Sequence, residues 1–374
     1  MKFLRASSVA VLVVSMNAFL ASRQAAVREA PSLKDVFRSA FYVGAALNER
    51  QFSGQDERGA AIVRAQFNSI TPENVLKWER VHPDPGRFDF AAADRYVAFG
   101  ERNGMRIIGH TLIWHHQTPE WVFHDSSGKR LTRESLLERM HDHIAAVVGR
   151  YKGRIAGWDV VNEALNEDGT LRNSPWREII GDEYIERAFQ FAHEADSSAE
   201  LYYNDYSLEN KPKRDGACAL IRKLQAEGIP VAAIGLQGHY KMTWPSGEQI
   251  DTTVTTFSRL GIRVMVTELD IDVVPASQKN KGADLDVNHR TLSNGDIYAS
   301  GLPDSVQTEL AMRYGSIFGI LLRHPGEIER VTFWGVTDGD SWLNSPGRTN
   351  YPLLFDRAGN PKPAFYAVVK SASR

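Results

Sequence analysis

The chain has 374 residues, of which 43% are hydrophobic and 24% are charged, and its formal net charge is −2. This composition is typical of a soluble globular protein with a large core and excludes disordered and collagen-like chains. The sequence contains no run of lysines and arginines that could displace counterions from a phosphate backbone. Nucleic acid is therefore not an expected partner.

The N-terminal 26 residues have the layout of a secretory signal peptide. Lys2 and Arg5 precede a mostly apolar stretch, Val9–Leu20, that is too short to span a membrane comfortably. The alanines that follow give no clear cleavage site. We expect export to the periplasm or the medium, no stable membrane insertion after processing, and one folded domain over residues 31–374. The alternative, an amphipathic N-terminal helix of a cytoplasmic protein, is disfavoured because no polar stripe interrupts Val9–Val14.

Eight short apolar segments of β character follow one another along the chain and alternate with segments of helical period. They are FYVGAAL (41–47), FNSITPEN (67–74), RIIGHTLIW (106–114), GWDVVNEA (157–164), ELYYNDY (200–206), AAIGLQGHY (232–240), RVMVTELD (263–270) and RVTFWGVT (330–337). Eight parallel strands with helical crossovers close into a barrel. The pattern therefore predicts an α/β fold of the (β/α)8 TIM-barrel class in a single domain.

Signals between the strands agree with this fold. Thr132 is the predicted N-cap of a helix that runs to about Tyr151, and Gly104, Gly228 and Gly261 are predicted C-terminal caps. The single cysteine, Cys218, lies in a helical stretch and is expected to be a buried, inert thiol. Residues 275–305 show little periodicity and predict a long loop on the C-terminal face, either functional or merely structural.

Polar residues are concentrated where the predicted strands end. GWDVV is followed by Asn162 and Glu163, and RVMV is followed by Thr267 and Glu268. Active sites of such barrels are built at the C-terminal strand ends. The residues collected there are Glu73, Asn74, Lys77, His110, Trp114, Gln117, Asn162, Glu163, Asn204, Gln237, His239, Glu268, Trp334 and Trp342.

Two opposed carboxylates suit glycosidic bond cleavage, one to protonate the leaving oxygen and one to attack or to activate water. Glu163 and Glu268 end the fourth and seventh strands, which face one another across the barrel. Their separation decides between retention, at about 5–5.5 Å, and inversion, at about 6.5–9.5 Å. An imidazole of His239 held by Asp270 would favour a charged Glu268, so we predict Glu268 as nucleophile.

Glu163 is then the predicted acid, with a pKa that neighbouring negative charge raises until the nucleophile has reacted. The amides offer paired donors and acceptors, and the tryptophan faces stack on sugar rings. The predicted ligand is therefore neutral and polyhydroxylated.

Six ordered motifs make the chain from about residue 41 to 369 resemble glycoside hydrolase family 10, the endo-β-1,4-xylanases. They are ITPENVLKW (70–78), GHTLIWHHQTPEW (109–121), WDVVNEAL (158–165), GLQGHY (235–240), VTELDI (266–271) and FWGVTDGDSWL (333–343). The resemblance implies a (β/α)8 catalytic domain, double displacement with retention, and Glu163 and Glu268 in the roles given above. Xylan and xylo-oligosaccharides are the implied substrates, and no cofactor or metal is expected.

The resemblance also implies where substrate binds. Glu73, Asn74, Lys77 and Trp342 would line the glycone subsites, and His110, Asn162 and Trp334 would surround the sugar at the cleavage point. Gln237 and His239 would lie beside the nucleophile, with Asp270 behind the histidine. Trp114 and Gln117 are also expected to contact substrate. The chain is expected to act as a monomer, without an appended carbohydrate-binding module after Val369.

Three other functions compete with this one. A barrel cellulase or other β-glycanase fits the chemistry but not HTLIWH or TPENVLKW. A catalytically silent glycan-binding barrel would keep the tryptophans and lose a carboxylate. A metal hydrolase would use His110, His115, His116 and His239 as ligands and leave Glu163 without a role.

Overall fold

The computed structural model describes residues 31–275 and 296–373. The chain divides into residues 1–32 and 33–374, and every element named below belongs to the second unit. Its strands are β1 (Tyr42–Leu47), β2 (Ser69–Pro72), β3 (Arg106–Ile113), β4 (Gly157–Asn162), β5 (Glu200–Asp205), β6 (Ala233–Leu236), β7 (His239–Lys241), β8 (Arg263–Asp272) and β9 (Ile328–Phe333).

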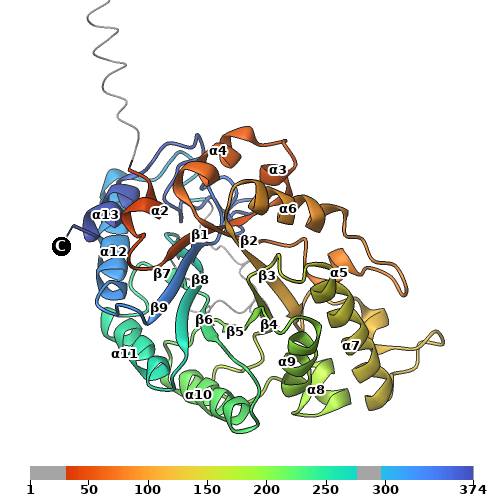
Figure 1. Cartoon of the computed structure of the whole chain (residues 1–374). Helices are drawn as coiled ribbons and strands as arrows, with labels where there is room; N and C mark the ends of the chain where they lie inside the picture. Colours follow the sequence, from red (N-terminus) through yellow and green to blue (C-terminus); the bar gives the residue numbers. More distant parts are fainter. Residues whose placement is uncertain (1–30, 276–295, 374) are drawn as a thin grey trace, which may run out of the picture. The chain divides into compact units, whose positions relative to one another are not determined.

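The strands form a closed parallel ring. The order runs from β6 through β5, β4, β3, β2 and β1 to β9 and β8, and the pairing of β6 with β8 completes the ring. Helices surround the ring, as Figure 1 shows. The predicted (β/α)8 TIM barrel is confirmed.

Each of the eight predicted segments contains a strand, but the sixth contains two. β6 and β7 are separated because Gly238 has a φ of 82°, a left-handed conformation that interrupts a strand. β7 then pairs with the end of β8, so that His239 lies opposite Asp270. The fourth segment ends at Asn162 rather than Ala164, because Glu163 has a φ of 57°.

The helix ends follow their sequence signals. Thr132 caps α7 by accepting the backbone N–H of Ser135 at 3.3 Å, and Gly104, Gly228 and Gly261 adopt left-handed conformations after α6, α10 and α11. The helices are α2 (Leu33–Val36), α3 (Glu49–Phe52), α4 (Glu57–Gln66), α5 (Trp78–Val81), α6 (Ala91–Arg102), the 3-10 turn η1 (Glu120–Phe123), α7 (Arg133–Arg150), α8 (Pro175–Ile180), α9 (Tyr184–Ala195), α10 (Lys211–Ala226), α11 (Gly247–Ser258), α12 (Asp304–Leu321) and α13 (Pro363–Ser371).

Charged side chains meet where the barrel strands begin. Arg106 at the start of β3 lies 2.6 Å from Glu200 of β5 and 2.8 Å from Glu329 of β9. Arg263 at the start of β8 lies 2.9 Å and 3.1 Å from the same two carboxylates. Two arginines and two glutamates from four strands thus form one network at the N-terminal end of the barrel, which we call the basal charge network.

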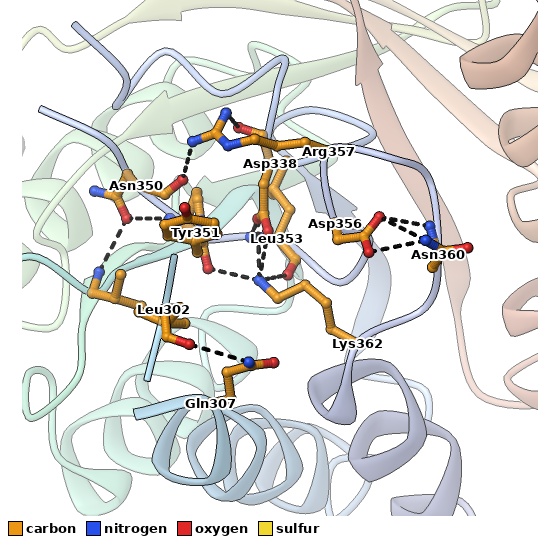
Figure 2. Close-up of polar contacts among 12 residues, drawn as sticks. Leu302, Gln307, Asp338, Asn350, Tyr351, Leu353, Asp356, Arg357, Asn360 and Lys362 are labelled. Atoms are coloured by element: carbon orange, nitrogen blue, oxygen red, sulfur yellow. Dashed lines mark hydrogen bonds and ion pairs between the residues drawn. The ribbon is translucent and has the colours of Figure 1, made fainter. Parts of the chain in front are cut away.

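The long connection between β9 and α13 carries two of the predicted tryptophans. Lys362 anchors it from the start of α13: its Nζ donates to the carbonyl oxygens of Tyr351 and Leu353, both at 2.8 Å, and to Asp338 at 3.1 Å (Figure 2). The ammonium is buried among oxygen acceptors, so these contacts hold the connection in one path. That path brings Trp342 to the C-terminal side of the barrel.

Some predictions fall outside the described residues. The predicted signal peptide, residues 1–26, lies there, as does most of the predicted 275–305 loop, residues 276–295. Cys218 lies in α10 and is a buried free thiol, as expected. Within residues 31–275 and 296–373, no helix combines the length and apolar character that a membrane crossing requires.

Candidate active site

A cleft with a cavity volume of about 170 Å³ opens at the C-terminal ends of the strands. The residues that line it all carry predicted site assignments: Glu73, Asn74, Lys77, His110, Trp114, Gln117, Asn162, Glu163, Gln237, His239, Glu268, Trp334 and Trp342. They lie in β3, β4, β7 and β8 and in the connections that follow β2, β3, β4, β6 and β9. Parallel strands account for this, because their carboxyl ends meet on one side of the barrel.

Glu163 follows β4 and turns its carboxyl into the cleft. Its Oε2 accepts from Nε1 of Trp114 at 2.8 Å, and its Oε1 accepts from Nε2 of Gln237 at 2.8 Å and from Nδ2 of Asn162 at 3.2 Å. The side chain is 7% exposed. The φ of 57° is uncommon for a residue with a side chain and is sustained only where the surroundings fix it.

The pKa of the Glu163 carboxyl is raised, chiefly by burial, which disfavours the charged form. Hydrogen bonds from Gln237 and Trp114 work in the opposite direction, and the negative charges of Asp205 and Glu268 raise the pKa further. Neighbouring negative charge therefore raises this pKa, as predicted, and desolvation, which was not predicted, raises it more. Glu163 holds a proton more readily than an ordinary glutamate.

Glu268, from the interior of β8, has the opposite environment. Its Oε1 accepts from Nδ2 of Asn204 at 2.8 Å, and its Oε2 lies 3.1 Å from Nε2 of His239. Burial raises the pKa of Glu268, but the hydrogen bond from His239, the charges of His110 and His239, and the hydrogen bond from Asn204 outweigh burial and lower it. Glu268 is thus held in its ionised form.

His239 connects Glu268 to a second carboxylate. Its Nδ1 lies 3.0 Å from Oδ1 of Asp270, and Oδ2 of Asp270 accepts from Nε1 of Trp342 at 2.7 Å. Burial lowers the pKa of His239, but Asp270 and Glu268 raise it to about 10. The imidazolium is therefore the donor to both carboxylates, and Asp270 is the residue behind it.

Amide side chains link the two cleft glutamates. Oδ1 of Asn162 accepts from Nδ2 of Asn204 at 2.9 Å, and the same Nδ2 donates to Glu268. Oδ1 of Asn204 accepts from the hydroxyl of Thr267 at 2.6 Å. The sequence placed Asn204 at a strand end but assigned it no role. An amide at the end of an apolar strand indicated a site residue. Its hydrogen-bond partners could not be predicted, because they depend on how β4, β5 and β8 are aligned.

Lys77, Asn74 and Gln117 form a polar group on one wall of the cleft. Nζ of Lys77 donates to Oε1 of Gln117 at 2.8 Å and to Oδ1 of Asn74 at 3.1 Å. Burial lowers the pKa of Lys77, and the negative charges of Glu268, Glu73 and Glu163 oppose that effect. Burial raises the pKa of Glu73, and the charge of Lys77 opposes it. This wall offers donors and acceptors suited to sugar hydroxyls.

Aromatic rings complete the lining. The Trp334 ring lies 5.3 Å from the ring of His110, edge to face, and the Trp342 ring lies 4.9 Å from that of His239. Nδ1 of His110 is held by Asp159 at 2.9 Å. The cleft therefore combines flat apolar faces with fixed polar groups, which is the surface that a pyranose ring requires.

The histidines of the metal-hydrolase alternative do not converge. In the described ranges no group of three or more His, Cys, Asp or Glu side chains is arranged to hold a metal ion. His110 and His239 are each engaged by an aspartate instead. The geometry thus gives no support to a metal centre built from these residues.

A larger cavity of about 680 Å³ adjoins the cleft on the side of β7. His239 lines both cavities, so the two adjoin at this residue. Lys241, Trp244, Asp272 and Tyr298 contribute to its wall. Neither Glu163 nor Glu268 lines this second cavity.

Known proteins are similar to this chain in sequence and structure. The model of "Glycosyl hydrolase family 10" matches residues 32–371. Endo-1,4-beta-xylanase A of Xylanibacter ruminicola is 42% identical over 349 residues, which cover 92% of this chain and 95% of that protein. A GH10 endoxylanase from a sugarcane soil metagenome superposes with a TM-score of 0.88 at 42% identity, over 91% of this chain and 99% of that one.

A third similar protein has been solved with a sugar bound. It is an intracellular xylanase of Thermoanaerobacterium saccharolyticum, of which a mutant was crystallised in complex with xylotriose. The match has a TM-score of 0.80 and 35% identity and covers 91% of this chain and 99% of that one. The family match, which spans nearly the whole described chain, and the shared barrel agree, so this protein belongs to glycosyl hydrolase family 10.

Proposed function

We propose that the protein is an endo-1,4-β-xylanase that cleaves internal bonds of xylan with retention, with Glu163 as acid/base and Glu268 as nucleophile. The observation that carries this proposal is the opposite bias of the two cleft carboxyls: the pKa of Glu163 is raised and that of Glu268 is lowered. One carboxyl is suited to donate a proton while the other is suited to attack.

In the first step, Oε of Glu268 attacks the anomeric carbon and forms a covalent glycosyl ester. The bond to the leaving oxygen breaks, and Glu163 gives that oxygen its proton. In the second step, Glu163, now ionised, takes a proton from water, and the resulting hydroxide replaces Glu268 at the anomeric carbon. Two inversions give net retention, and both carboxyls return to their starting states.

Loss of the Glu268 charge in the covalent intermediate lowers the pKa of Glu163, because one of the charges that raise it has disappeared. The carboxyl thereby changes from acid to base between the steps. Burial and the charge of Asp205 remain, so only part of the original increase in the pKa is lost.

Internal cleavage of a polymer is supported by the larger cavity that adjoins the cleft at His239, where further sugar units of a chain could bind. Xylo-oligosaccharides, as bound by the Thermoanaerobacterium mutant, are the proposed ligands. The tryptophan faces and amides recognise a neutral sugar chain. We also propose that the protein acts as a monomer, which light scattering of the purified protein tests directly.

The test of the activity is release of reducing sugar from glucuronoxylan, arabinoxylan and carboxymethylcellulose, measured side by side. We expect strong release from the xylans and its loss in Glu268→Ala. Preference for the cellulose derivative would identify the protein as a cellulase or other β-glycanase. Absence of sugar release from all three polymers would favour the catalytically silent glycan-binding barrel.

Export is a separate proposal, supported by Lys2, Arg5 and the apolar stretch Val9–Leu20. Expression of the full chain in a bacterial host, followed by fractionation and N-terminal sequencing, tests it. We expect an extracytoplasmic protein that has lost its first residues. Leu12→Arg should keep the protein in the cytoplasm with its N-terminus intact. If the unaltered chain were found only in the cytoplasm, with its N-terminus intact, export would be contradicted.

A further inference from the structure

The turn after β4 is held by side chains from the end of β5. The backbone N–H of Ala164 donates to the hydroxyl of Tyr203 at 3.2 Å, and the N–H of Leu165 donates to Oδ2 of Asp205 at 3.4 Å. The Tyr203 hydroxyl itself donates to the same Asp205 oxygen. Both peptide groups that follow Glu163 are therefore fixed by one carboxylate, directly or through one hydroxyl.

Asp205 is in turn fixed by a lysine from a helix that surrounds the ring of strands. Lys213 lies in the first turn of α10, its side chain is fully buried, and its Nζ lies 2.9 Å from Oδ1 of Asp205. A cation in the first turn is unfavourable for the helix dipole, and a buried ion pair is weak support for stability. Helix stability therefore does not explain why a lysine is buried at position 213. A role in fixing the position of Asp205 does explain it.

We propose that Asp205 and Lys213 form a positioning pair for the acid/base: Asp205 holds the left-handed turn that directs Glu163 into the cleft, and Lys213 fixes Asp205. The inference rests on the proposed role of Glu163. A left-handed residue with a side chain persists only where its surroundings determine it, and these contacts supply that constraint.

The pair also acts on Glu163 through its charges. The charged groups that face Glu163 are Asp205 from β5, Glu268 from β8 and Lys77 from the turn before α5, while the Arg172 guanidinium donates to the Glu163 carbonyl oxygen at 3.2 Å. The negative charge of Asp205 raises the pKa of Glu163. The ammonium of Lys213 lies 2.9 Å from Asp205 and carries the opposite charge, so it should oppose this effect.

The two single variants should therefore move the basic limb of the pH profile of kcat/KM in opposite directions. Asp205→Asn leaves a positive Lys213 near Glu163, so the limb should shift to lower pH. Lys213→Met leaves a negative Asp205, so the limb should shift to higher pH. The double variant should return toward the unaltered enzyme. A purely structural pair would give shifts of one sign or none, and either result would overturn the proposal.

Leaving-group dependence gives a second readout. On aryl xylobiosides, Asp205→Asn and Tyr203→Phe should lose on the order of tenfold or more in kcat/KM with a poor leaving group, because general-acid catalysis is worth about 100- to 10,000-fold. Both should change little with a good leaving group, which needs no protonation. Equal losses on both substrates would overturn the positioning role. Tyr203→Phe keeps this test available if Asp205→Asn does not fold.

Two reference variants separate the possible failures. Lys223→Met removes another charge from α10, one that pairs with Glu186, and should leave both readouts unchanged. Glu163→Ala should show the leaving-group dependence in its extreme form. If Glu163→Ala shows none, the proposed acid/base assignment has failed. If Glu163→Ala shows the leaving-group dependence and Asp205→Asn does not, only the positioning pair is refuted.

Discussion

Glu163 and Glu268 lie in one cleft but are hydrogen-bonded by different kinds of group. Glu163 accepts from the neutral donors Trp114, Gln237 and Asn162. Glu268 accepts from the imidazole of His239, whose pKa of about 10 keeps it charged at neutral pH. A charged donor stabilises an ionised carboxylate about twice as strongly as a neutral donor. The pKa values of the two glutamates are thus shifted in opposite directions although both side chains are buried.

Glu268→Ala should abolish hydrolysis of xylan, because no covalent intermediate can form. Added azide should enter the vacated space and restore turnover of an activated aryl glycoside, giving an α-glycosyl azide. NMR of the product identifies the anomer. A β-azide, or rescue of Glu163→Ala to the same α product, would contradict the assignment of Glu268 as nucleophile.

His239→Gln should shift the acid limb of kcat/KM to higher pH. The acid limb reports the ionisation of the nucleophile in the free enzyme. Loss of the imidazolium removes the hydrogen bond and the charge that lower the pKa of Glu268, so this pKa rises. A higher pH is then needed to ionise Glu268, and the variant loses activity at a higher pH on acidification. An unmoved acid limb would show that other groups hold Glu268 ionised.

At the residue scale, prediction succeeded where position along a strand was enough. The thirteen cleft residues could be named because strand ends converge. The roles of Asn204, Tyr203 and Asp205 could not, because their partners depend on how β5 lies against β4 and β8. The raised pKa of Glu163 was predicted from neighbouring charge alone, because the sequence does not reveal how deeply that side chain is buried.

Among the elements, strands were the most predictable, since each barrel strand is an apolar run between polar ends. The break between β6 and β7 escaped prediction because Gly238 lies inside such a run, in GLQGHY, and its φ of 82° could not be foreseen. The break has a function in the site: it lets β7 pair independently with β8 and brings His239 opposite Asp270.

Helix α7 offers a test at the same scale. Thr132→Ala removes the side-chain acceptor for the N–H of Ser135 and should lower the free energy of unfolding by about 1 kcal/mol. Thr132→Ser keeps the acceptor and should keep the stability. Thermal unfolding measures both, and activity at low temperature should not change because Thr132 does not line the cleft. A Thr132→Ser variant as unstable as Thr132→Ala would contradict the cap.

For the whole molecule, the basal charge network should govern stability in acid. Burial raises the pKa of Glu200, but hydrogen bonds from Tyr202 and Arg263 and the arginine charges lower it to about 2 from its usual 4.5. A carboxyl whose pKa falls on folding stabilises the native state above its unfolded pKa. Its contribution is then lost as the pH falls from about 4.5 to about 2.

When Tm is measured at several pH values in this range, it should fall more steeply on acidification for the unaltered protein than for Glu200→Gln. The amide of the variant does not titrate. Glu227→Gln, at the C-terminal end of α10, is a suitable control and should keep the steep fall. Equal slopes for all three would show that Glu200 does not contribute. The variant should also be less stable at neutral pH, because it leaves Arg106 and Arg263 with fewer charged partners.

Asp270 accepts hydrogen bonds from His239, which contacts the proposed nucleophile Glu268, and from Trp342, whose ring lines the cleft. Protein engineers who replace Trp342 to admit bulkier sugars will also remove a donor from Asp270. The freed carboxylate then binds His239 more strongly and alters its hold on Glu268. We therefore expect substitutions of Trp342 to alter the pH dependence of activity together with substrate range, and a library that varies Trp342 should be screened at several pH values rather than one.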